Sequence, residues 1–129
     1  MNKKMANEWL KSASDDLVLI EEIIDNVNLT HMTAFHAQQA VEKSLKAVLE
    51  YNSCKVPKKH DLIQLKVLVS EYVMIENDDI LDSLNRLYIE SRYPGDLGLL
   101  PYGKPDVVDA KMFYEYAKNI YERITLLLN

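Results

Sequence analysis

Glycine and proline are concentrated in one short part of this sequence. All three glycines and three of the four prolines lie between Ser91 and Pro105. Because glycine and proline supply the backbone conformations of tight turns, their scarcity elsewhere favours a few long helices over the many short strands of a sandwich or barrel. The sequence therefore predicts one long irregular connection at Ser91–Pro105, and connections of that length in compact domains are often functional.

The spacing of apolar residues agrees with a helical protein. They recur at intervals of three and four, and no useful stretch alternates apolar and polar residues with period two. The sequence predicts an all-α, antiparallel up-and-down bundle of four to five helices that forms a single domain over residues 1–129. The helices expected are Met5–Val27, Thr33–Tyr51, Leu62–Tyr72, Asp79 to Arg92 or Tyr93, and Val107–Leu127.

Polar residues at the expected helix ends indicate how these helices begin. Thr30 or Thr33 is expected to cap the second helix, the residues 77–79 the fourth, and Asp106 the last, with Asp109 in its first turn. On the first helix, four acidic side chains are expected to mark the solvent-facing side. They are Asp15, Asp16, Glu21 and Glu22.

Length and charge exclude several classes of protein. At 129 residues, with 48% hydrophobic and 27% charged residues, the chain has the composition of an ordinary globular domain. A net charge of −5 argues against non-specific electrostatic binding of nucleic acid, although a local basic pocket is compatible with it. Cys54 lacks the companions of a zinc site, and from the pattern of the first residues we expect neither a signal peptide nor a membrane span. We therefore expect a cytoplasmic protein with no metal and no cofactor.

The segment Thr33–Tyr51 holds the longest uninterrupted helical pattern and the densest group of polar residues. His36, Gln39 and Lys43 follow one another at steps of three and four, so their side chains can share one face. Gln38, Glu42 and Lys46 form a parallel row. Two interpretations stay open: an exposed face with a Glu42–Lys46 pair that contributes a few tenths of a kcal/mol, or a functional site.

Familiar catalytic motifs are absent, and only isolated polar residues remain as candidates. The sequence contains no phosphate-binding glycine loop, no HExxH and no Gly-x-Ser-x-Gly. His60 and Asp61 open the third expected helix, where they could serve as a cap or as part of a site, with Lys59 beside them. Arg92 and Tyr93 close the fourth, where an arginine complements the helix dipole whatever else it does.

Four landmarks, in order and spanning nearly the whole chain, resemble those of the HEPN domain family. The landmarks are Trp9…Ala13…Asp16-Leu17, then FHAQQAVEKSLKAVL over residues 35–49, then Pro57…His60-Asp61-Leu62, and then SRYPG over residues 91–95.

The resemblance implies a compact bundle of about five helices, usually paired as a homodimer, in small proteins often encoded beside a minimal nucleotidyltransferase. Such pairs are associated with toxin and antitoxin roles. The family name also implies nucleotide binding, for which Lys43, Arg92 and Lys59 would contact phosphate and Tyr93 would stack on a base.

The resemblance also implies a possible activity, because many HEPN proteins are metal-independent ribonucleases. Their signature is an arginine followed, after four to six residues, by a histidine. This sequence departs from that signature. The positions where the histidine would fall, counted from Arg92, hold Leu97, Gly98 and Leu99, and no histidine follows His60. The acid–base group that would act on a ribose 2′-hydroxyl is therefore missing from its motif position. Whether the protein is an enzyme stays open on this ground.

The main hypothesis is a HEPN protein that partners a nucleotidyltransferase in a toxin–antitoxin-type or nucleotide-linked system. It would bind a nucleotide or RNA at a polar cleft formed by His36, Gln39, Lys43, Arg92 and Tyr93. One alternative is a metal-independent ribonuclease toxin in which His36 or His60 replaces the missing histidine. Another is a nucleotide-sensing dimeric adaptor.

Overall fold

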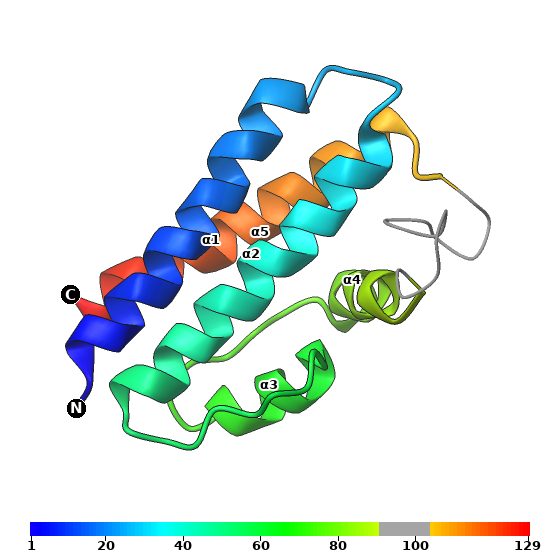
Figure 1. Cartoon of the computed structure of the whole chain (residues 1–129). Coiled ribbons are helices and arrows are strands. Elements are labelled where there is room, and N and C mark those ends of the chain that lie inside the picture. Colours follow the sequence, from blue (N-terminus) through cyan, green and yellow to red (C-terminus); the bar gives the residue numbers. More distant parts are fainter. Residues whose placement is uncertain (91–103) are drawn as a thin grey trace.

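The computed structural model describes residues 1–90 and 104–129, and these residues form five helices and no strands (Figure 1). This confirms the all-α fold class. The helices are α1 (Lys3–Ile23), α2 (Thr30–Tyr51), α3 (Leu62–Val69), α4 (Asp78–Glu90) and α5 (Val107–Leu128). None of them combines the length and the apolar character that a helix needs to cross a membrane.

α2 is the central helix of the fold and contacts each of the other four helices. Its buried side chains lie on every side of the helix from Ser44 to Leu49, as expected where a helix is enclosed by its neighbours. Four apolar residues at helical spacing on α2 are fully buried, namely Ala37, Val41, Leu45 and Val48. The segment with the longest helical pattern in the sequence therefore forms the centre of the core.

α1 runs antiparallel to both α2 and α5 (Figure 1). At one end, the backbone N–H of Asn2 donates to the carbonyl of Tyr51 at 3.3 Å. At the other end, the Lys104 Nζ atom, just before α5, donates to the Asn28 carbonyl at 2.6 Å. The short helices α3 and α4 lie on the other side of α2 from α1 (Figure 1).

Local capping explains several helix ends. The Asn2 side chain accepts from the Met5 N–H and starts α1 two residues earlier than expected. The threonine cap expected for α2 is wrong, because the helix already begins at Thr30 and its N-cap, Leu29, provides no side-chain hydrogen bond.

The ends of the later helices agree better with the sequence. Asp106 and Asp109 form a reciprocal capping box at the start of α5, as expected. α3 ends at Val69 instead of continuing to Tyr72. The backbone N–H groups of Ser70 and Tyr72 donate to the carbonyls three residues earlier, those of Val67 and Val69, as in a tight turn. Asn77 adopts a φ of 64° immediately before α4. The predicted irregular connection lies almost entirely outside the described residues.

Candidate functional site

Two residues of the predicted polar row meet at one carboxylate. His36 and Lys43 stand two turns apart on α2, so both side chains leave the same face of the helix. The His36 Nδ1 atom lies 2.8 Å from Asp16 Oδ1, and the Lys43 Nζ atom donates to Asp16 Oδ2 at 2.7 Å. Asp16 is almost fully buried on α1, whereas the His36 and Lys43 side chains keep 19% and 21% of their surface exposed.

The expectation that Asp16 lies on the solvent-facing side of α1 is wrong, because Asp16 is buried. Asp15 is exposed as expected, but Asp16 faces α2. A signal for this was present, because Asp16 follows Ala13 by three residues and precedes Ile20 by four, which places it on the buried stripe. Asp16 is therefore the site residue that the sequence-based interpretation missed.

A second carboxylate, Glu42, gathers the other polar row. Its side chain accepts from Lys46 Nζ at 3.1 Å and from Gln38 Nε2 at 3.2 Å, and lies 2.9 Å from His60 Nδ1. Gln39 donates to Gln38 Oε1 at 2.6 Å. Gln39 thus joins the Glu42 cluster through Gln38. His36 and Lys43, the other two residues of its predicted row, join the Asp16 cluster.

The Glu42–Lys46 pair is buried and is not the exposed pair that one interpretation of the sequence expected. The two side chains expose only 4% and 6% of their surface. The Lys46 Nζ atom also lies 5.3 Å from the centre of the Trp9 ring, and Trp9 in turn donates to Glu50 at 3.1 Å. A buried ion pair depends on such additional contacts to offset the cost of removing both charges from water.

The remaining sequence candidates are placed in different surroundings. Asp61 caps α3, accepting from the N–H groups of Ile63 and Gln64, and also accepts from Asn85. His60 belongs to the Glu42 cluster, and Lys59 lines a surface groove. Arg92 and Tyr93 lie outside the described residues.

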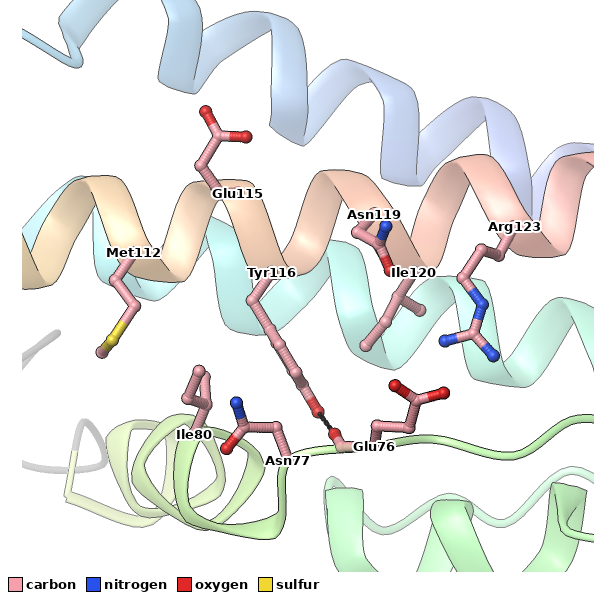
Figure 2. A pocket seen from close by; sticks show the side chains of 9 residues that line it. All are labelled: Glu76, Asn77, Ile80, Met112, Glu115, Tyr116, Asn119, Ile120 and Arg123. Carbon is pink, nitrogen blue, oxygen red and sulfur yellow. Dashed lines mark hydrogen bonds between the residues drawn. The ribbon is translucent and has the colours of Figure 1, made fainter.

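Three hollows of the structure lie away from the Asp16 cluster. One cavity, of about 340 Å³, lies where α5 faces the start of α4 and the residues before it (Figure 2). The Tyr116 hydroxyl donates to the Glu76 carbonyl at 2.7 Å on one wall, and Arg123 donates to the Met74 carbonyl at 2.7 Å. Burial, more than the nearby carboxylate of Asp78, raises the pKa of Tyr116 to about 12.

Two further hollows are lined by other residues. One, of about 310 Å³, lies between the end of α2 and the end of α5. The other, of about 560 Å³, is the groove that contains Lys59. His36, Gln39 and Lys43 line none of these three hollows. In the described part of the chain, no three His, Cys, Asp or Glu side chains are grouped so that they could hold a metal ion.

Two carboxylate-centred clusters lie along α2, one around Asp16 of α1 and one around Glu42 of α2 itself. Each carboxylate holds one lysine and one histidine, and Gln38 and Gln39 extend the second cluster along α2. A histidine whose Nδ1 atom faces a carboxylate is oriented for proton transfer or hydrogen bonding at Nε2. The arrangement can therefore hold cationic and hydrogen-bonding groups in place at the edge of α2.

Comparisons with known proteins place this fold. The model of the HEPN domain matches residues 6–127. The crystal structure of TT1696 from Thermus thermophilus is similar with a TM-score of 0.77 and 24% identity, over 98% of this chain and 99% of that one. The crystal structure of ST0689, an archaeal HEPN homologue, is similar with a TM-score of 0.66 and 20% identity, over 96% and 98% of the two chains. No curated protein matches in sequence. Since the family model covers nearly the whole length, the chain belongs to the HEPN domain family.

Proposed function

We propose that this HEPN protein acts as the partner of a minimal nucleotidyltransferase in a toxin–antitoxin-type or nucleotide-linked system. Family membership over residues 6–127 supports this proposal, together with the lack of a histidine four to six residues after Arg92. A HEPN protein without the ribonuclease signature is better suited to binding than to cleavage.

The test is to purify the protein from its source cells under native conditions and to identify the chains that elute with it. The proposal expects a nucleotidyltransferase in stoichiometric amount. A monomer that elutes alone would contradict it.

The ligand of the protein, in this proposal, is a nucleotide or RNA bound at His36, Gln39 and Lys43 together with Arg92 and Tyr93. The geometry of the Asp16 cluster is the observation that supports it. Asp16 fixes His36 and Lys43 at 2.8 and 2.7 Å, and about a fifth of each side chain remains open to solvent. Donors held in place in this way lose little conformational freedom when a phosphate binds, and so favour affinity.

Nucleotide binding would raise the melting temperature, because a ligand selective for the folded state stabilises it by mass action. The comparison is the wild-type protein against Lys43→Gln, with Lys11→Gln as the matched control, since Lys11 is an exposed lysine on α1. The proposal expects a shift with ATP or GTP that Lys43→Gln loses and Lys11→Gln keeps. An equal shift in both variants would place the ligand elsewhere.

The active form in this proposal is a homodimer, as is usual in the family that the sequence resembles. Light scattering on the purified protein tests this directly, with an expected mass twice the 14.9 kDa of one chain. A mass of one chain at all concentrations would contradict the dimer.

A metal-independent ribonuclease is the second candidate, and one observation favours it. The Nδ1 atom of His36 faces Asp16, and within the described residues no hydrogen-bond partner is found for its Nε2 atom. This is the arrangement of a histidine general base oriented by a carboxylate. The candidate expects cleavage of single-stranded or transfer RNA in the presence of a chelator, lost in both His36→Ala and Arg92→Ala. Intact RNA with folded wild-type protein would eliminate it.

A further inference from the structure

A surface groove lies beside α3, and none of the residues of the Asp16 cluster lines it. Its volume is about 560 Å³, the largest of the three hollows described above. The connection before α3 supplies most of its wall, and α3 supplies the rest. We call it the lysine groove and define it by Lys55, Val56, Pro57, Lys58, Lys59 and Leu68.

The lysine groove concentrates positive charge that the rest of the described chain does not neutralise. Lys55, Lys58 and Lys59 are all exposed, and among the described residues none of them has an ion-pair partner. Lys66, on α3 itself, is by contrast paired with Asp78. Three unpaired lysines within five residues are notable in a chain whose net charge is −5.

The helix beside these lysines exposes apolar side chains. Leu62, Leu65 and Val69 bury the inner face of α3 in the core. On the outer face, Ile63, Val67 and Leu68 are 38%, 66% and 41% exposed. Ile63 and Val67 are four residues apart and share one face of α3, whereas Leu68 lies on the neighbouring face and lines the groove.

We propose that the lysine groove binds an acidic segment of a partner protein, one that inserts a bulky apolar side chain between Pro57 and Leu68. Glutamate or aspartate residues on either side of that anchor would face Lys55, Lys58 and Lys59. Charge complementarity carries the choice of partner, and Pro57 and Leu68 give the anchor an apolar surface to bury. The inference concerns a surface separate from the Asp16 cluster and does not depend on the ligand proposed there.

Other anionic partners fit the groove less well. Among the described residues, no aromatic side chain lines the groove, so a nucleic acid base would find there no ring on which to stack. A flat lipid surface would leave the hollow between Pro57 and Leu68 unfilled. A peptide side chain, by contrast, requires both a hollow and a rim of complementary charge.

A random peptide library displayed on phage and selected against the whole protein tests the proposal. The selected peptides should be rich in Asp and Glu around a Leu, Ile, Phe or Met. Synthetic, fluorescently labelled copies then provide affinities by anisotropy. Reversing one lysine, as in Lys58→Glu, should weaken binding by about threefold to tenfold, and reversing all three by about a hundredfold or more.

Controls separate the groove from general charge attraction. Lys4→Glu and Lys11→Glu reverse exposed lysines on α1 and should leave the affinity unchanged. Leu68→Ser should weaken binding without altering charge, and circular dichroism would confirm that each variant is folded. Peptides in which Gln replaces Glu should lose affinity.

Three results would overturn the proposal. The first is a selection that yields no peptides, or peptides without acidic residues. The second is equal binding by the triple lysine variant. The third is single-stranded RNA, or vesicles of phosphatidylserine, that bind the same three lysines more tightly than any selected peptide.

Discussion

The Nδ1 atom of His36 on α2 lies 2.8 Å from the Oδ1 atom of Asp16 on α1, two residues separated by twenty positions in the sequence. This contact joins the two helices at a point where apolar packing alone would be expected. Asp16 also accepts from Lys43, so one buried carboxylate fixes two basic groups of the proposed ligand site.

Asp16→Asn should lower the free energy of unfolding by about 1–3 kcal/mol, because it leaves Lys43 and His36 without their charged partner in a partly buried position. The value lies below that of a fully buried pair, since water reaches both partners. Urea unfolding measures it, and Asp15→Asn on the exposed side of α1 is the matched control, with an expected change within about 0.5 kcal/mol. Equal losses in the two variants would contradict the account.

Glu42→Gln should be more costly, because Glu42 and Lys46 are nearly inaccessible to solvent. Breaking one partner of such a pair lowers stability by about 3–5 kcal/mol. The exposed Glu8→Gln on α1 serves as the control. A double variant, Glu42→Leu with Lys46→Leu, should recover part of the loss, since it removes both charges at once. A double variant as unstable as Glu42→Gln would show that the cost does not come from an unpaired charge.

Tyr116 should make the protein less stable at high pH. Its pKa is raised from 10 to about 12 in the folded state, chiefly by burial. Above pH 10 the unfolded chain releases this proton while the folded chain retains it, so its contribution is fully present below pH 10 and is lost as the pH rises to 12. Tyr116→Phe should reduce the fall in unfolding free energy across this window. Parallel curves for the two proteins would contradict the assignment.

The helices can be predicted well from the sequence, because the spacing of apolar residues along the chain indicates an amphipathic helix directly. The helix expected at Thr33–Tyr51 lies within α2, and Asp106 with Asp109 caps α5 as expected. The position of a helix start was less predictable where no side chain caps it, as at Thr30. There, the tertiary environment decides where the helix begins.

The candidate site was predictable only in part. The spacing of His36 and Lys43 correctly predicts that they share one face of a helix. It does not predict that this face meets α1. Asp15 and Asp16 differ by about 100° around a helix, so a small error in the phase of the stripe exchanges their roles. Gln39 was assigned to the same row, yet its actual partner is Gln38, a contact set by rotamers and not by helical spacing.

The most direct test of the proposed ligand site is a nuclear magnetic resonance titration of the isotopically labelled protein with ATP and with a short single-stranded RNA. The account predicts saturable shifts of the backbone amides around His36, Gln39 and Lys43 with at least one of the two ligands. Lys43→Gln should abolish these shifts, while residues 55–59 of the lysine groove remain unaffected. A well-dispersed spectrum that does not change at millimolar concentrations of either ligand would contradict the account.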